Sequence, residues 1–108
     1  MFKLYVKEGK KDLALLRRYR EIAERVKKLV LRRCDARIYV FGSVLSGKVT
    51  ACSDIDILVV CNLNREEALK LKVEVIREIG LEVPVQLHIV NERELKWYLR
   101  FIDELLEV

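Results

Sequence analysis

The 108-residue sequence predicts a small α/β (α+β) domain in which a mixed β-sheet carries helices mainly on one face and leaves the other face partly open. Three observations support this fold class. Apolar residues recur at helical spacing near the start of the chain, short β-branched segments follow, and two capping boxes mark later helices. With 52% hydrophobic residues the chain can bury a core, and its length predicts a single domain spanning residues 1–108.

The first predicted element is a long amphipathic helix over residues 10–33, because apolar residues recur there every three or four positions between Lys, Arg and Glu. These apolar residues are Leu13, Leu16, Tyr19, Ile22, Val26, Leu29 and Val30. A buried strand is predicted next over residues 37–41, "RIYVF", which Gly42 ends. A second strand of the same character is predicted over residues 55–61, "IDILVVC".

Two capping boxes predict the remaining helices. Asn64 and Glu67 open a helix that runs to about Ile79, and Gly80 is placed to end it. A strand over residues 83–90 follows, with one apolar and one polar face. Asn91 and Glu94 then repeat the capping box, and the spacing of the later apolar residues predicts a closing helix. That helix includes Leu95, Tyr98, Leu99, Ile102 and Leu105.

Charge and cysteine usage restrict the class of protein. The net charge of +4 suits anionic ligands such as nucleotides, but basic residues alternate with acidic ones along helical faces, so nucleic-acid binding is not supported. Cys34, Cys52 and Cys61 are odd in number and lack CxxC spacing, which favours a reducing cytoplasm over a disulfide framework or a zinc site. The sequence shows neither a signal peptide nor the roughly 18 apolar residues of a membrane span, so no membrane association is expected.

Gly42 and Ser43 lie where the first strand ends, and this pair is a candidate phosphate-binding turn. Glycine lets the backbone approach a ligand closely, and a serine hydroxyl can donate to a phosphate oxygen. Gly47 and Lys48 extend the candidate nucleotide site with a permissive turn and a positive charge for a polyphosphate. The alternative is that Gly42 and Ser43 form only a tight turn.

Asp54 and Asp56 are candidate metal ligands and catalytic residues. Residues two apart on a strand share a face, so these carboxylates point the same way while Ile55 and Ile57 face the core. Carboxylate oxygens suit Mg²⁺, and two ions together can activate an attacking oxygen and stabilise a leaving one. In the structural alternative Ser53 and Asp54 cap a turn and Asp56 only faces water.

Residues 42–56, "GSVLSGKVTACSDID", resemble the motif of the nucleotidyltransferase superfamily related to DNA polymerase β, and the short chain resembles its minimal nucleotidyltransferases (MNT). The motif is Gly-Ser, ten residues, Asp, one residue, Asp. The resemblance implies the polymerase β-like fold, with Gly42 and Ser43 holding the β- and γ-phosphates of ATP or another nucleoside triphosphate. It also implies that Asp54 and Asp56 hold Mg²⁺.

The sequence departs from the family pattern in two places. Many members carry a basic residue two or three positions after the serine, where this chain has Leu45 and Ser46. Members also commonly carry a third carboxylate on a neighbouring strand, where Gln86 is the expected occupant and catalytic candidate. An amide oxygen can coordinate a metal but cannot act as a base at neutral pH. His88 could accept a proton instead, or have only a structural role. Glu82, just before the strand, is a further candidate.

Minimal members of the family are often encoded beside a small helical HEPN protein. In such pairs the nucleotidyltransferase resembles an antitoxin that neutralises its partner. The resemblance therefore implies transfer of AMP to a tyrosine hydroxyl of such a partner. A second hypothesis is a non-catalytic module that masks its partner, with Trp97, Tyr98 and Phe101 as interface candidates, although we expect at least two of these in the core. Transfer to a small molecule or RNA ranks lower, because the chain has no room for an acceptor domain. The sequence leaves the oligomeric state open, an oligomer included.

Overall fold

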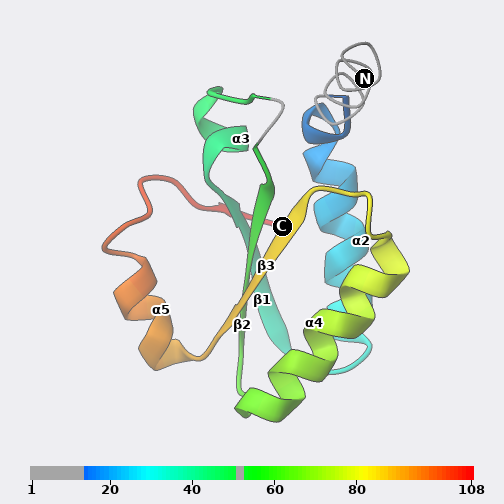
Figure 1. Ribbon diagram of the computed structural model, residues 1–108. Coiled ribbons are helices and arrows are strands. Elements are labelled where there is room, and N and C mark those ends of the chain that lie inside the picture. The colour runs from blue at the N-terminus through cyan, green and yellow to red at the C-terminus, as the bar shows by residue number, and fades with distance from the viewer. Residues whose placement is uncertain (1–13, 51–52) are drawn as a thin grey trace.

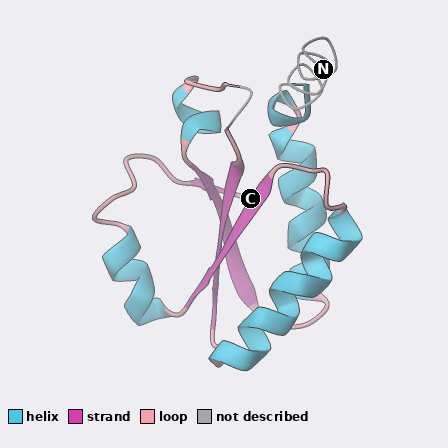
Figure 2. Ribbon diagram, in the orientation of Figure 1, coloured by secondary structure: helices cyan, strands magenta, loops and turns pink. Residues whose placement is uncertain are grey.

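The computed structural model of the protein describes residues 14–50 and 53–108. Helices and strands alternate along the chain in the order that Figures 1 and 2 show. The elements are α2 (Tyr19–Leu31), β1 (Ala36–Phe41), α3 (Ser43–Ser46), β2 (Ile55–Cys61), α4 (Arg65–Ile79), β3 (Val85–Val90), α5 (Glu92–Tyr98) and β4 (Leu106–Glu107). Within these residues no helix is both long and apolar enough to cross a membrane.

The strands form one mixed sheet in the order β3-β2-β1-β4. β1 pairs antiparallel with both β2 and β4, whereas β2 and β3 are parallel and are joined by the crossover helix α4. The predicted fold class, a mixed sheet with helices mainly on one face, is therefore confirmed.

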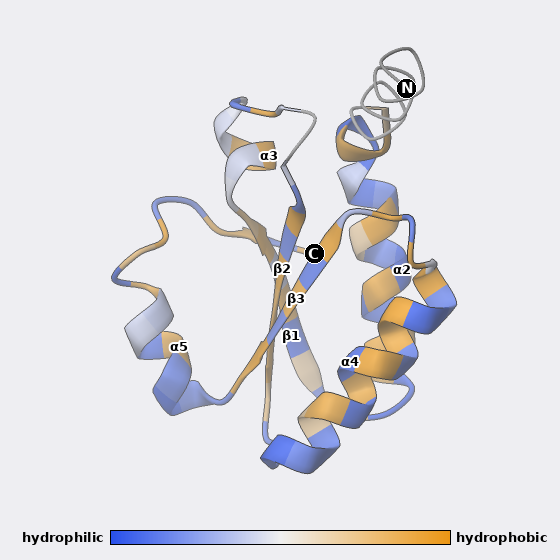
Figure 3. Cartoon of the chain, viewed as in Figure 1, coloured by the Kyte–Doolittle hydropathy of each residue, from blue (hydrophilic) through white to orange (hydrophobic). Residues whose placement is uncertain are grey.

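The main core lies between the sheet and the helices α2 and α4. Alternate residues of β2 face these helices, and the apolar stripes of the helices cover them, as the hydropathy pattern along α2 and α4 in Figure 3 indicates. This core includes Val26 and Val30 of α2, Ile55 and Ile57 of β2, and Val75 of α4, all fully buried. Burial of the apolar core is the dominant favourable contribution to the free energy of folding.

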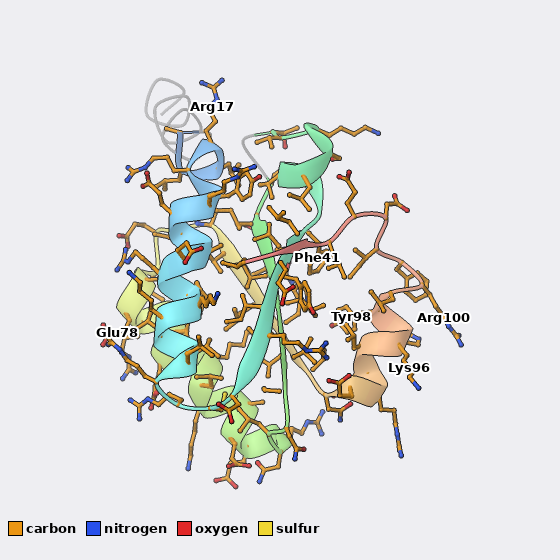
Figure 4. The ribbon with its side chains drawn as sticks, turned by 180° about the vertical axis from the view of Figure 1, so that it is seen from behind. Arg17, Phe41, Glu78, Lys96, Tyr98 and Arg100 are labelled. Atoms are coloured by element: carbon orange, nitrogen blue, oxygen red, sulfur yellow. The ribbon has the colours of Figure 1, made fainter. Side chains whose placement is uncertain are left out.

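The opposite face of the sheet carries a smaller core beneath α5. Leu58, Val60 and Val90 are buried there, and Tyr98 of α5 packs against them. In Figure 4 Tyr98 points from α5 toward the sheet, whereas Lys96 and Arg100 point to the solvent. α5 thus covers only part of this face.

Two predicted helices differ from the structure in length. The helix predicted over 10–33 is interrupted at Arg18, whose φ of −97° and ψ of 23° are not helical, and α2 begins at Tyr19; residues 10–13 lie outside the described part. Apolar spacing continues across a one-residue interruption, so periodicity did not reveal it.

The closing helix is shorter than predicted. α5 ends at Tyr98, and Ile102 and Leu105 pack against the smaller core from a segment without helical structure. The chain then forms β4, in which Leu106 pairs with Val40 of β1. Strand pairing at the sheet edge therefore replaced the last helical turns that apolar spacing alone predicted.

Candidate active site

The turn after β1 lies directly against a carboxylate of β2. Gly42 has φ 88° and ψ −155°, a backbone conformation that residues other than glycine rarely adopt. A Cβ atom at this position would lie 2.5 Å from Oδ2 of Asp56. The backbone can approach the carboxylate this closely only because residue 42 is glycine.

The strand register explains this approach. β1 and β2 are antiparallel, and Phe41, the last residue of β1, pairs with Asp56 near the start of β2. Antiparallel pairing brings the end of one strand to the beginning of the next, although ten residues separate Ser43 from Asp54 in the sequence. The Gly-Ser turn and the aspartates are thus brought to the same end of the sheet.

Asp54 and Asp56 flank a buried residue of the main core. Ile55 and Ile57 are fully buried, Asp56 lies between them with 23% of its side chain exposed, and Asp54 is exposed one residue before β2. The alternation directs the carboxylates away from the face that α2 and α4 cover. The Ser53 hydroxyl accepts a hydrogen bond from the Thr50 N–H (3.1 Å), so this bond does not involve Asp54.

His88 links Asp56 to α5. Its Nε2 lies 3.3 Å from Oδ1 of Asp56, and its Nδ1 lies 3.4 Å from the hydroxyl of Tyr98. The ring also packs against Phe41, with 5.2 Å between ring centroids. Both imidazole nitrogens therefore have partners, an arrangement that orients the Asp56 carboxylate. The sequence indicates Tyr98 only as an interface or core residue, because the docking of α5 cannot be seen in the sequence.

Gln86 is the second residue of β3. In the parallel pairing of β2 and β3 it lies opposite Asp56, and its side chain is exposed. Paired residues on neighbouring strands share a face, so the amide and the Asp56 carboxylate belong to one surface. Glu82 instead lies in the turn after α4, within 3 Å of where a Cβ of Gly80 would be.

The candidate nucleotide-binding residues follow the turn. Ser43 is half-buried at the start of α3, a helix of only four residues. Gly47 ends α3 in the left-handed conformation (φ 75°), and Lys48 beyond it is exposed. Leu45 packs against the main core, which is why this position holds an apolar rather than a basic side chain.

A small cavity of about 170 Å³ lies beside the turn. Phe41, Gly42 and Ser46 line one side, and the segment after α5 supplies the other, including Phe101, Asp103 and Glu104. The sequence indicates Phe101 only as an interface candidate and contains no signal for Asp103 or Glu104, because only the course of the chain between α5 and β4 brings these residues to the site. The cavity is smaller than the roughly 300–1,000 Å³ of a small-molecule pocket, so a nucleotide would extend out of it.

The donor set fits Mg²⁺. No group of three or more His, Cys, Asp or Glu side chains that could enclose a metal occurs among the described residues. Mg²⁺ needs no such group, since it keeps several waters and takes one or two carboxylates together with substrate phosphates. Asp54 and Asp56 would supply these carboxylates, and the Gln86 amide would add a neutral oxygen.

The site thus combines a Gly-Ser turn that lies against the Asp56 carboxylate with a second aspartate, Asp54, just before β2, on a mixed sheet with a crossover helix. The chain belongs to the nucleotidyltransferase domain family, whose sequence model matches residues 19–106. This match includes every predicted site residue. No curated protein matches the chain significantly.

Two solved structures resemble the chain. A crystal structure of a proposed nucleotidyltransferase is 32% identical, with a TM-score of 0.64, over 82% of this chain and 95% of that one. A second proposed nucleotidyltransferase, from Sulfolobus solfataricus, is 21% identical with a TM-score of 0.55, over 94% of this chain and 83% of that one, and shows the same fold. General nucleotidyl transfer is therefore the activity of the family to which the chain belongs.

Proposed function

We propose that the protein is a Mg²⁺-dependent nucleotidyltransferase that transfers AMP from ATP to a hydroxyl of a partner protein, as the antitoxin-like component of a HEPN/MNT pair. The observation that carries the proposal is the contact between the Gly42 turn and the Asp56 carboxylate, where a Cβ would lie 2.5 Å from Oδ2. A triphosphate on the turn is then next to the carboxylates that would hold its metal.

The reaction assigns a role to each element of the site. The acceptor oxygen attacks the α-phosphorus, the bond from that phosphorus to the bridging oxygen breaks, pyrophosphate leaves, and the acceptor proton passes to water. Bound Mg²⁺ would neutralise charge on the phosphates and favour the deprotonated acceptor. Asp54 and Asp56 would hold the metal, Gly42 and Ser43 the terminal phosphates, and Lys48 would add a positive charge. His88 keeps Asp56 oriented.

An exposed aromatic surface favours a protein as the acceptor. Trp97 and Phe101 are 57% and 70% exposed, and their ring centroids are 4.9 Å apart. The expectation that at least two of the three aromatic residues lie in the core was wrong, because of the three only Tyr98 packs against the smaller core. Phe101 also lines the cavity beside Gly42, so a protein docked on these rings would present its hydroxyl next to the site. A tyrosine of a small helical HEPN-type protein is the proposed acceptor.

The second candidate is a catalytically weak or inactive binding module that neutralises its partner by forming a complex. Gln86 favours it, because a neutral amide stands opposite Asp56 where the family commonly has a carboxylate. The same aromatic surface would serve this function without transfer.

A transfer assay separates the two candidates. The protein is incubated with Mg²⁺, labelled ATP and the product of the adjacent gene, beside the variants Asp54→Asn, Asp56→Asn and Asp35→Asn. Asp35 is an exposed acid outside the site, so its variant controls for loss of charge. For an enzyme we expect the first two variants to lose label transfer by about 100-fold or more and the control to keep it.

The binding module predicts a different result. The parent then transfers no label, and both aspartate variants still neutralise the partner. Gln86→Glu is included because it restores the negative charge that the family commonly has. If the missing charge limits the rate, this variant transfers label faster than the parent.

A further inference from the structure

β3 is an edge strand without the usual protection. It is the last strand of the order β3-β2-β1-β4, so no strand of the described residues pairs with its outer side. In Figure 1 it crosses in front of β2, with α4 to one side and α5 to the other. Its six residues, "VQLHIV", contain no Lys, Glu, Asp, Pro or Gly, the residues that normally prevent pairing at an edge.

The opposite edge of the sheet differs. β4 has only two residues, Leu106 and Glu107, and a strand this short offers little to pair with. Of the two edges, β3 is therefore the one that can accept another strand.

An apolar groove accompanies this edge. Leu87 and Ile89 of β3 line it together with Ala68 and Leu69 of α4, and its volume is about 550 Å³. Leu69 is 63% exposed, and Val73, one helical turn further along α4, is 47% exposed. Exposed backbone groups and exposed apolar side chains thus occur side by side on one surface.

Three charged residues of α4 line this groove, Arg65, Glu66 and Lys72, and the last two are placed self-complementarily. Glu66 and Lys72 also line it, and they lie three residues before and three residues after Leu69 on α4. If two copies of α4 cross antiparallel at Leu69, Glu66 of each copy faces Lys72 of the other. Within the single chain Glu66 forms an exposed ion pair with Lys70 on the same helix, with 3.6 Å between Oε1 of Glu66 and Nζ of Lys70.

The residues of β3 fit a two-fold axis that passes beside the α4 crossing at Leu69. Leu87 and Ile89 both face the groove, and His88 between them faces the opposite side of the sheet, against Phe41. In an antiparallel pair centred on His88, Leu87 of one copy lies opposite Ile89 of the other. The groove brings this part of β3 next to Leu69, so one axis satisfies both the strand and the helix.

We propose that the protein forms a two-fold symmetric homodimer through antiparallel pairing of β3 with β3 of a second copy, covered by α4 against α4. The axis is perpendicular to the sheet, so the two sheets join into one and both candidate sites open on the same face. This proposal is independent of whether the site is catalytic.

Sedimentation velocity over a range of protein concentrations tests the proposal. The variants are Glu66→Lys, Lys72→Glu, their combination, and Leu69→Lys, with Lys28→Glu on α2 as the control for altered charge. We expect the parent to form a dimer, and each single reversal to weaken it about tenfold at low salt by opposing like charges. The combined reversal should restore the parent's affinity, Leu69→Lys should abolish the dimer, and the control should match the parent.

Hydrogen exchange provides a second measurement. The outward-facing amides of β3 should exchange more slowly as the parent dimerises, whereas in Leu69→Lys they should not. A parent that stays a single chain at its highest soluble concentration overturns the proposal. So does a dimer that Leu69→Lys and both single reversals leave unchanged, because its interface then lies elsewhere.

Discussion

The lack of a side chain at residue 42 permits both the backbone conformation of the turn and its close approach to Asp56. Gly42 adopts a positive φ that turns the chain out of β1, and it leaves room for the Asp56 carboxylate that a Cβ would meet at 2.5 Å. Any larger residue must therefore strain the turn and displace Asp56 together. Asp56 is in turn tied to His88, so the displacement would extend to a second side chain.

Gly42→Ala is expected to destabilise the protein by about 1–3 kcal/mol and to abolish nucleotidyl transfer. Gly80→Ala is the matched control, since Gly80 also has positive φ (112°) but its Cβ would meet only the end of the flexible Glu82 side chain. Chemical denaturation and the transfer assay measure the two effects. If both variants lose stability and both keep transfer, the contact with Asp56 has no catalytic importance.

The residues of the site differ in how far the sequence reveals them. Gly42, Ser43, Asp54 and Asp56 could be placed because a turn and a strand alternation are local properties, and the structure brings the turn and Asp56 into contact. Tyr98, Asp103 and Glu104 could not, because their positions depend on how the chain after β3 folds back over the sheet.

Among the elements, α5 depends most on its first residue. The Asn91 side chain accepts a hydrogen bond from the Glu94 N–H (2.8 Å), and the Glu94 carboxylate accepts one from the Asn91 N–H (3.1 Å). A helix of seven residues is marginal without such support, and none of its residues is fully buried. α4 has the same capping box at Asn64, but it has 15 residues and a buried face.

Removing each cap should therefore have a different effect. Asn64→Ala is expected to lower the global unfolding free energy by about 1 kcal/mol. Asn91→Ala should mainly loosen α5, so that its amides exchange faster while those of β2 and α4 change little. Native-state hydrogen exchange on both variants distinguishes the two patterns, and equal, uniform changes would contradict this assignment.

The elements also show where sequence patterns stop being sufficient. Both capping boxes and the strands β1, β2 and β3 were predicted because capping and alternation are local. The end of α5 was not, since β4 forms only by pairing with β1 across the molecule. The break at Arg18 was missed because the apolar spacing continues through it.

At the scale of the whole molecule, two thiols lie at the end of the sheet away from the site. Cys61 is buried and pairs with Ala36 at the far end of the β1–β2 register from Asp56. Burial raises the pKa of its thiol to about 11, and the neighbouring Cys34 adds to the shift. Burial also raises the pKa of Cys34. Cys52 lies outside the described residues.

These pKa shifts predict a loss of stability in alkali. The unfolded Cys61 thiol loses its proton near its ordinary pKa of 9.0, whereas the folded protein retains it until about 11. The stabilisation is therefore complete below pH 9.0 and is lost as the pH rises through about 11. Cys61→Ala should be less stable than the parent near neutral pH, and the difference should narrow over this range. Urea denaturation at several pH values measures it, and a constant difference would contradict the shift.

The pairing of β1 with β2 changes what the spacing of the motif means. Phe41 is held opposite Asp56 by the ladder of the sheet itself, and this register does not depend on how many residues join the two strands. The ten residues between Ser43 and Asp54 are the most recognisable property of the motif, yet they measure the length of a connection. Relatives with longer or shorter connections could therefore keep the same chemistry, provided that the hairpin aligns in the same way.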